Sequence, residues 1–247
     1  MRTIHVIGIG AGDPDYVTTQ AISALNDTQV FFAMDKGETK DDLVALRRLI
    51  CDRFITEPGY RFVELPDPKR ATDGHYRDNV DEWHAARARL WARAIDTELG
   101  PDGVGAFLAW GDPSLYDSTL RILERVGEHV AFDFDVIPGI TAIQALTARH
   151  RIALNEIGAP VLITTGRRLR DHGLTEDAVV MLDGECSFLT CPPDTQIWWG
   201  AYLGTPDELL ESGTVGEVGE RIAARRAEAR ARHGWIMDIY LLRGAGR

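Results

Sequence analysis

Three short segments rich in glycine and proline each follow a stretch with the character of a buried strand. Residues 8–14 read GIGAGDP, residues 110–114 read WGDPS, and residues 137–142 read IPGITA. Glycines let the backbone turn sharply and approach a ligand, and the polar residues supply hydrogen-bonding groups. Ligands of open α/β sheets bind at the carboxyl ends of strands, so three such loops indicate a small-molecule site at one sheet edge. Taken singly, each loop is also explained by ordinary turn chemistry.

The first loop invites comparison with the dinucleotide-binding fingerprint. That fingerprint places glycines at the first, third and sixth positions. Here Gly8, Gly10 and Gly12 fall at the first, third and fifth positions, and Asp13 occupies the sixth. A carboxylate at a helix start repels a pyrophosphate, and Asp35 lies 27 residues after Gly8 rather than about 20 residues beyond a fingerprint. A nicotinamide-dependent oxidoreductase is therefore the weaker interpretation.

The composition of the whole chain excludes several classes of protein. The 247 residues carry a net charge of −11, whereas a nucleic-acid binder normally has a basic excess. No apolar run approaches the roughly 20 residues that span a bilayer, and the N-terminal residues show no signal-peptide pattern. Cys51, Cys186 and Cys191 lack CxxC spacing, and the histidines form no HxxxH pair. We expect a cytoplasmic protein with no disulfide framework, no metal site, no nucleic acid and no membrane.

The first half of the chain alternates between strand-like and helix-like segments. Strands are expected at 3–9, 29–33, 103–109 and 130–136, helices at 17–27, 41–53, 76–99, 115–125 and 140–148, and a loop at 56–73. Such alternation implies a parallel sheet that is covered by helices on both faces. Residues 1–150 are therefore predicted to form a doubly wound α/β domain, followed by a linker within 149–158.

The second half has fewer helices for each strand. Strands are expected at 160–165, 178–183, 195–203 and 235–243, with one long helix at 216–232. This ratio favours a mixed, partly antiparallel sheet in a domain spanning residues 151–247. The predicted fold class is α/β, with two α/β domains of which the first has a doubly wound parallel sheet and the second a mixed sheet.

The strings GIGAGDPDYVT, WGDPSLYDST and VIPGITA, in this order, resemble the three hallmark motifs of the tetrapyrrole methylases, the class III S-adenosylmethionine-dependent methyltransferases. The resemblance covers nearly the whole chain, although Val17 stands where leucine is usual and Asp117 where glycine or serine is common. It implies a homodimer acting on a tetrapyrrole. It also implies that S-adenosylmethionine binds in the cleft between the two domains and leaves as S-adenosyl-L-homocysteine.

The resemblance also implies individual site residues. Positions that match the family's cofactor contacts are Pro14, Trp110, Gly111, Asp112, Leu115, Thr141, Ala142, Leu182, Asp183, Ala201 and Tyr202. Asp112 can accept a hydrogen bond from an ammonium or hydroxyl group, or cap the following helix, and the two roles are compatible. The adenine-side segment, often Pro-Ala in relatives, is here Trp235-Ile236, which departs from the pattern.

Further features resemble the branch of the family that methylates C-1 of precorrin-5 and releases the ring's acetyl group as acetate. They are the insert PDPKRATDGHYRDNVDEWHAARARLW, the early MDKGETKDDL and the tail GWIMDIYLLR. The macrocycle supplies the carbon nucleophile, so methyl transfer mainly requires orientation, whereas loss of acetate benefits from a base and an oxyanion donor. The catalytic candidates are Asp112, Tyr116 and Asp35, with Lys36, Asp183, His75 and Tyr76 as further candidates for the base. Lys36, Lys69, Arg70 and Arg77 are candidates for gripping the substrate's carboxylates.

Several alternatives stay open at this point. One is a methylase that acts at another ring carbon and releases no acetate, which the mass of the product distinguishes. Relatives also methylate RNA or protein, and the acidic charge argues only against RNA. A third is a non-catalytic protein that binds S-adenosylmethionine, which turnover on a macrocycle would exclude.

Overall fold

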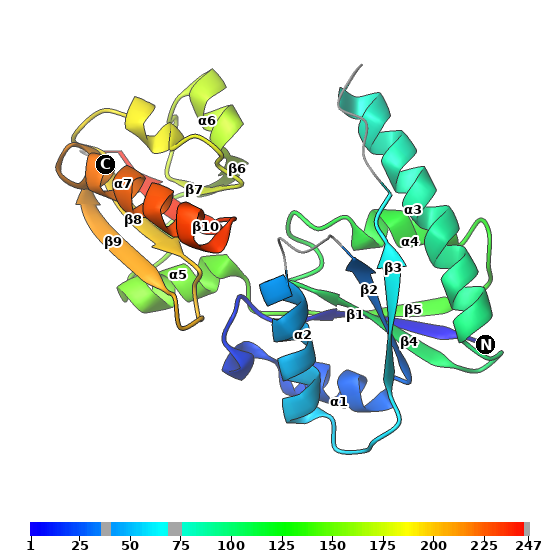
Figure 1. The fold of residues 1–247 in the computed structure, drawn as a ribbon. Coiled ribbons are helices and arrows are strands. Elements are labelled where there is room, and N and C mark those ends of the chain that lie inside the picture. Colours follow the sequence, from blue (N-terminus) through cyan, green and yellow to red (C-terminus); the bar gives the residue numbers. More distant parts are fainter. Residues whose placement is uncertain (36–40, 69–75, 245–247) are drawn as a thin grey trace. The chain divides into compact units, whose positions relative to one another are not determined.

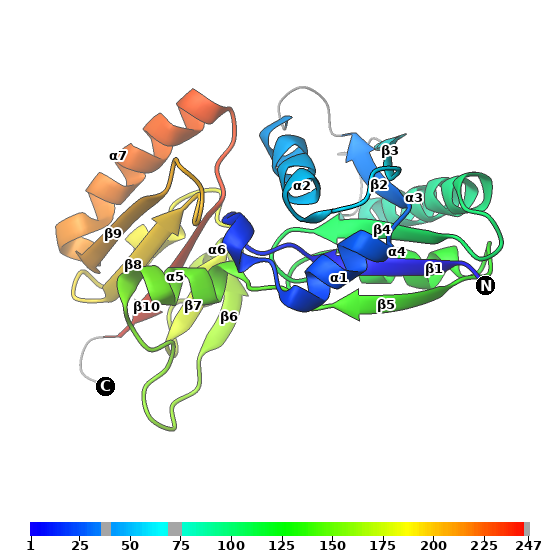
Figure 2. The ribbon, with the colours of Figure 1, turned by 90° about the horizontal axis from the view of Figure 1, so that it is seen from below.

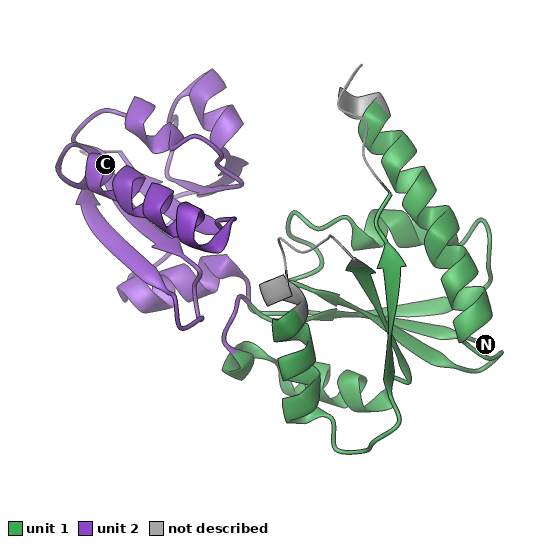
Figure 3. Cartoon of the chain, in the orientation of Figure 1, with its two compact units in different colours: residues 1–10, 14–140 green, residues 11–13, 141–247 purple. Residues whose placement is uncertain are grey.

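The computed structural model describes residues 1–35, 41–68 and 76–244 of the chain, which divides into two compact units (Figure 3). Unit 1 comprises residues 1–10 and 14–140, and unit 2 comprises residues 11–13 and 141–247. The division falls after Ile140, whereas the sequence placed the domain boundary at residue 150. The difference arises because the helix that follows Ile140 packs on strands of the second sheet.

Unit 1 is built on a five-stranded parallel sheet with the order β3-β2-β4-β1-β5 (Figure 1). The strands are β1 (Thr3–Gly8), β2 (Val30–Asp35), β3 (Arg61–Pro66), β4 (Val104–Ala109) and β5 (Asp133–Ile137). The predicted parallel sheet is confirmed. Its order differs from the 3-2-1-4-5-6 order of dinucleotide-binding domains, which further weakens the oxidoreductase interpretation.

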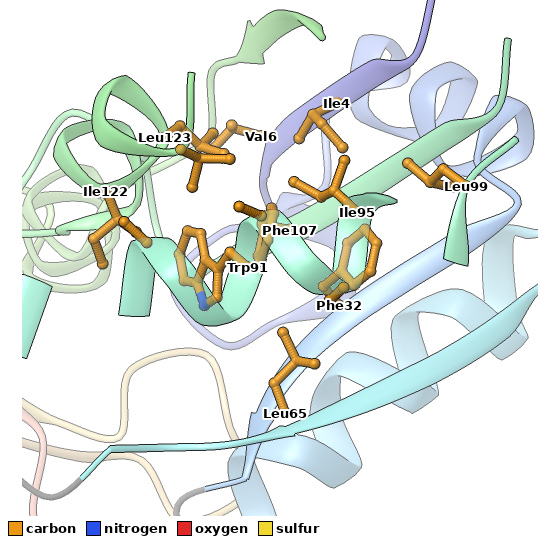
Figure 4. Packing of buried hydrophobic residues seen from close by; sticks show 14 of the residues in the cluster. Ile4, Val6, Phe32, Leu65, Trp91, Ile95, Leu99, Phe107, Ile122 and Leu123 are labelled. Carbon is orange, nitrogen blue, oxygen red and sulfur yellow. The ribbon is translucent and has the colours of Figure 1, made fainter. Parts of the chain in front are cut away.

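Helices cover both faces of this sheet, as the alternation in the sequence predicted (Figures 1 and 2). They are α1 (Thr19–Asp27), α2 (Asp41–Phe54), α3 (Tyr76–Glu98) and α4 (Thr119–Val126). On one face, Trp91 of α3 stacks on Phe107 of β4 with ring centroids 4.1 Å apart, and Ile122 of α4 joins the same core (Figure 4). On the other face, Leu25 of α1 and Ile50 of α2 are fully buried. The sheet whose strand ends carry the three glycine-containing loops is therefore packed against helices on both faces.

Strand β3 corrects the prediction that residues 56–73 form a loop. Arg61–Pro66 pairs in parallel with β2 at the edge of the sheet, and Phe62 stacks on Phe31 with centroids 5.3 Å apart. Of its six residues only Leu65 is buried. An edge strand tolerates charged residues and a terminal proline, so its composition resembles that of a loop.

Unit 2 contains a five-stranded mixed sheet with the order β6-β7-β10-β8-β9. Its strands are β6 (Leu162–Thr165), β7 (Ala178–Met181), β8 (Gln196–Ala201), β9 (Leu209–Thr214) and β10 (Asp238–Arg243). Only β6 and β7 are parallel neighbours, and the other pairs are antiparallel, so the predicted mixed sheet is confirmed. The last strand among the described residues, β10, lies in the middle of the sheet.

The helices of unit 2 are α5 (Ala142–His150), α6 (Gly166–His172) and α7 (Val215–His233), with a 3-10 turn at Ser187–Thr190. Helices α7 and α5 pack on opposite faces of the sheet (Figure 2). Ile222 of α7 shares a core with Trp199 of β8, whereas the next residue, Gly200, faces Leu146 of α5. The sequence prediction missed α6, which is short and charged, and β9, which is mostly polar and contains Gly213.

Candidate functional site at the carboxyl ends of the strands

The three glycine-containing loops predicted from the sequence meet at the carboxyl edge of the unit 1 sheet. They follow the neighbouring strands β4, β1 and β5. Gly10 and Gly111 exchange two backbone hydrogen bonds of 3.3 and 2.8 Å. A Cβ atom on Gly139 would lie 2.0 Å from the Gly111 carbonyl oxygen, and one on Gly8 would lie 2.6 Å from the Gly139 nitrogen. The glycines are therefore required for the loops to pack against one another.

Asp112 joins two of these loops. One carboxylate oxygen accepts a hydrogen bond of 2.9 Å from the backbone nitrogen of Gly139, and the other accepts from the backbone and hydroxyl of Ser114 at 2.8 and 2.5 Å. Burial opposes ionisation of this carboxyl, but the hydrogen bonds from Ser114 and Gly139 prevail and lower the pKa of Asp112. Asp112 does not cap α4, whose N-cap residue is Ser118. The residue holds the loops in position.

Thr141 and Ala142, two further predicted cofactor residues, form the start of α5. The Thr141 hydroxyl oxygen accepts from the backbone nitrogen of Ile143 at 3.1 Å, and the Gln144 side chain accepts from the backbone nitrogen of Thr141 at 3.1 Å. This reciprocal capping fixes the first turn of the helix. Thr141 and Ala142 belong to unit 2, whereas in unit 1 the predicted residue Pro14 begins a 3-10 turn at Pro14–Tyr16, and Leu115 lies in the loop after β4.

Three predicted site residues have an uncommon backbone conformation. Tyr116, Leu182 and Tyr202 have φ angles of 51°, 52° and 50°, in the left-handed region that residues other than glycine seldom adopt. Each follows the carboxyl end of a strand, and Tyr116 and Leu182 are exposed by 45% and 67%. Such conformations persist where the surrounding structure imposes them, and they cluster at ligand-binding sites. Arg151 and Cys186, with φ angles of 56° and 55°, share this conformation, so it does not by itself select the predicted site residues.

The predicted residues of unit 2 gather at one edge of its sheet. Strands β7 and β8 both run antiparallel to β10, so Leu182, at the end of β7, and Tyr202, at the end of β8, lie at the same edge. Tyr202 donates its hydroxyl to the carbonyl oxygen of Trp235 at 2.6 Å, and the two rings pack edge to face. Gly12, which belongs to unit 2, lies near this edge, since a Cβ atom on Gly12 would lie 2.2 Å from the Leu203 carbonyl oxygen.

Asp183 is buried at this edge and is fully engaged by hydrogen bonds. Its carboxylate accepts from the backbone nitrogens of Glu185 and Ser187 at 3.0 and 2.6 Å, from the Ser187 hydroxyl at 2.8 Å, and from the Tyr240 hydroxyl at 2.6 Å. Burial opposes its ionisation, but these donors, Tyr240 foremost, lower the pKa of Asp183. A carboxylate with a lowered pKa and four donors is a poor base for water. Asp183 therefore stabilises the edge of the sheet.

Two buried indole nitrogens, those of Trp110 in unit 1 and Trp235 in unit 2, have no hydrogen-bond partner among the described residues. A buried donor without an acceptor is costly, so each fits a site where a ligand supplies the acceptor. Trp110 was among the predicted contacts. Trp235 was left out of them because it departs from the family pattern, and nothing else in the sequence marked it.

The predicted substrate-binding residues Lys36, Lys69 and Arg70, and the candidate base His75, lie outside the described residues. Asp35 ends β2, at the carboxyl edge of the sheet, and Tyr76 and Arg77 begin α3. The side chains of these three residues also lie outside the described part of the chain. Among the described residues, no helix has the length and apolar character needed to cross a membrane.

Comparison with known proteins identifies the family. Residues 3–219 match the family model of the Tetrapyrrole (Corrin/Porphyrin) Methylases, and the chain belongs to this family. It is 54% identical over 250 residues to the precorrin-6A synthase (deacetylating) of Sinorhizobium sp, an alignment that covers 98% of this chain and 95% of that protein.

Solved structures agree with this assignment. A putative cobalamin synthesis related protein (CobF) from Corynebacterium diphtheriae is 46% identical, with a TM-score of 0.86 and coverage of 98% of both chains. Uroporphyrin-III C-methyl transferase from Thermus thermophilus, complexed with S-adenosyl homocysteine, shares 18% identity. Its TM-score of 0.60, over 97% of this chain and 91% of that one, shows the same fold.

Proposed function

We propose that the enzyme is an S-adenosylmethionine-dependent C-methyltransferase of cobalamin biosynthesis. It methylates C-1 of precorrin-5 and releases acetate to give precorrin-6A. The observation that carries this proposal is the 54% identity to the Sinorhizobium precorrin-6A synthase over nearly the full length of both chains. The Sinorhizobium precorrin-2 C(20)-methyltransferase, which represents the alternative without deacetylation, is only 29% identical over 188 residues, or 72% of each chain.

The residues present fit S-adenosylmethionine, which supplies an electrophilic methyl group when bound. The unpartnered indole nitrogens of Trp110 and Trp235 provide donors, and the fixed backbone around Gly111 provides further donors and acceptors. The residues proposed to hold the cofactor are Pro14, Trp110, Gly111, Leu115, Thr141, Ala142, Leu182, Ala201 and Tyr202. Asp112 and Asp183 position the loops that carry them. These groups contribute orientation, which is the main requirement of a methyl transfer.

Loss of acetate makes a different demand on the protein. Water attacks the acetyl carbonyl carbon, the bond from that carbon to the ring breaks, and the electron pair passes to the macrocycle. A lowered pKa makes Asp112 and Asp183 weak bases, so neither suits the activation of water. Tyr116, exposed at the carboxyl edge of the sheet, is the proposed donor toward the carbonyl oxygen, and Asp35 is the proposed base.

Calorimetry followed by turnover tests the proposed function. We expect S-adenosyl-L-homocysteine to bind with one-to-one stoichiometry and NADH to show no heat of binding. With precorrin-5 and S-adenosylmethionine, mass spectrometry should show one added methyl group and the loss of the acetyl group, with acetate released in equal amount. A methylated product that retains its acetyl group would contradict the deacetylating reaction, and preferential binding of NADH would contradict the methyltransferase.

We also propose that the enzyme acts in the cytoplasm as a homodimer. Its three cysteines are free thiols, which suits a reducing compartment. Both β5 and β6 are edge strands that expose large apolar side chains, namely Phe134, Val136, Leu162 and Ile163. Exposed apolar edges of this kind are commonly covered by a partner.

Sedimentation equilibrium tests the dimer. We expect a mass twice the 27.4 kDa of one chain. Replacing Phe134 or Ile163 with glutamate should shift the mass toward that of one chain, because an unpaired charge would be buried in the interface. The exposed Glu124→Gln substitution serves as a control. A single-chain mass for the unaltered protein at micromolar concentration would contradict the proposal.

A further inference from the structure

Arg226 of α7 is a buried cation inside unit 2. Its Nε–H donates to the carboxylate of Asp238, the first residue of β10, at 2.9 Å, and the two side chains are exposed by only 8% and 4%. The same carboxylate accepts from the indole nitrogen of Trp199 at 3.0 Å. A buried ion pair adds little net stability, because the loss of hydration offsets the attraction of the charges. The pair with Asp238 does not by itself explain a cation at this position.

The terminal nitrogens of Arg226 bind the turn that follows β7. They donate to the carbonyl oxygens of Asp183 and Gly184, the second at 3.4 Å, across 43 and 42 positions of the chain. A guanidinium group carries five N–H donors in a rigid plane, so it can face a carboxylate with one side and two carbonyl oxygens with the other. Arg226 therefore ties the turn after β7 to the middle of α7.

This turn has an unfavourable backbone conformation at both ends. Leu182 and Cys186 have left-handed φ angles of 52° and 55°, and such a conformation costs about 1–3 kcal/mol at a residue other than glycine. Asp183 and Gly184, whose carbonyls bind Arg226, lie between them. The Leu182 side chain is 67% exposed, so burial in the core does not hold this residue in place. Its conformation depends on the backbone contacts of the residues that follow it.

We propose that Arg226 is a positioning residue that holds the carbonyls of Asp183 and Gly184 and thereby presents Leu182 to the cofactor. The inference rests on the proposed function, in which Leu182 contacts S-adenosylmethionine. Loss of the guanidinium group frees the turn and weakens cofactor binding, while the rest of unit 2 stays folded.

A charge-balanced double variant isolates the hydrogen bonds to the turn. Arg226→Met combined with Asp238→Asn leaves no unpaired charge in the core, and the asparagine oxygen can still accept from Trp199. The matched control combines Arg225→Met with Glu211→Gln. Arg225 is the preceding residue of α7 and also donates to a carboxylate, that of Glu211 at 3.2 Å, and to a backbone carbonyl, that of Leu210 at 3.0 Å. Its partners belong to β9 and not to the turn.

Amide hydrogen exchange of the full-length protein tests whether Arg226 holds the turn. The reporters are the amides of Glu185 and Ser187, which donate to the Asp183 carboxylate. We expect their exchange to rise about tenfold in the Arg226 double variant and to stay unchanged in the control, with α5 unchanged in both. Unchanged exchange at 185–187 would overturn the proposal. An equal rise in α5 would also overturn it, because Arg226 would then stabilise the whole unit.

Ligand affinity and turnover test the effect on the cofactor. In the Arg226 double variant we expect the Kd of S-adenosyl-L-homocysteine and the KM for S-adenosylmethionine to rise at least about tenfold. The kcat at saturating S-adenosylmethionine and precorrin-5 should stay within about threefold, as should all three constants in the control. Unaltered cofactor affinity in the Arg226 double variant would overturn the proposal alone. If the protein without substitutions fails to bind S-adenosyl-L-homocysteine, the proposed function is wrong, and hydrogen exchange still decides whether Arg226 holds the turn.

Discussion

Replacing Gly139 with alanine is expected to abolish measurable binding of S-adenosyl-L-homocysteine and to destabilise the protein by about 3 kcal/mol or more. The added Cβ atom would lie 2.0 Å from the Gly111 carbonyl oxygen and 2.8 Å from the Gly8 carbonyl carbon. Both atoms belong to the backbone, so no side-chain rotation relieves the overlap. The loops after β4, β1 and β5 must move apart instead. Calorimetry and urea unfolding measure the two effects.

Gly100→Ala provides the matched control for this experiment. Gly100 lies in the same unit, and a Cβ atom there would have no heavy atom within 4 Å. Its stability should stay within about 0.5 kcal/mol of the unaltered protein, with unchanged affinity for S-adenosyl-L-homocysteine. If Gly139→Ala bound the nucleoside as well as Gly100→Ala does, the close packing of the three loops would not be needed for the site.

Replacing Asp183 with asparagine is expected to lower the free energy of unfolding by about 2–4 kcal/mol at neutral pH. The carboxylate accepts four hydrogen bonds, and each of its two oxygens faces one backbone N–H, that of Glu185 or of Ser187. Whichever of the two oxygens is replaced by the asparagine NH₂ group, that group would face a backbone N–H, so two hydrogen-bond donors would point at each other. Urea unfolding at pH 7 measures the effect, and the exposed Asp194→Asn in the same unit is the control.

The loss of stability caused by Asp183→Asn is also expected to depend on pH. Because the pKa of Asp183 is lowered in the folded protein, its stabilisation is present above the ordinary aspartate pKa of about 4 and is lost as the pH falls through the lowered value. The difference in stability between the unaltered protein and Asp183→Asn should therefore be largest near pH 7 and shrink below about pH 4. If the difference in stability between the two proteins is the same at pH 7 and at pH 3, the charge of Asp183 does not account for its stabilising effect.

Features that depend on local sequence pattern were predictable. The glycines at 8 and 139 marked the strand ends because a Cβ atom at either position would overlap backbone atoms of the neighbouring loops. The alternation of strands and helices gave the parallel sheet and its two covered faces. Strand β3 was missed because Phe62 and Leu65 are flanked by charges and prolines that an edge strand tolerates.

Features that depend on distant residues could not be predicted in the same way. The sequence selected Asp112 as a candidate, but its hydrogen bond to Gly139 spans 27 positions, and only the fold shows that Asp112 joins the two loops. The partner of Asp183, Tyr240, lies 57 positions away. Arg47 stands in an ordinary amphipathic helix, and only the fold places its Nε atom at 3.2 Å from the carbonyl oxygen of Leu108.

The position of β10 has a consequence for the synthesis of the protein. All five strands of unit 1 have been made once Ile137 has left the ribosome, so that sheet can assemble while translation continues. The second sheet cannot be completed until Asp238–Arg243 has been made, because this strand pairs with both β7 and β8. A chain that lacks this strand lacks the centre of that sheet and exposes two unpaired strand edges, which are sites of aggregation. The second unit therefore completes its sheet only when β10 is available, whereas unit 1 has all of its strands by Ile137.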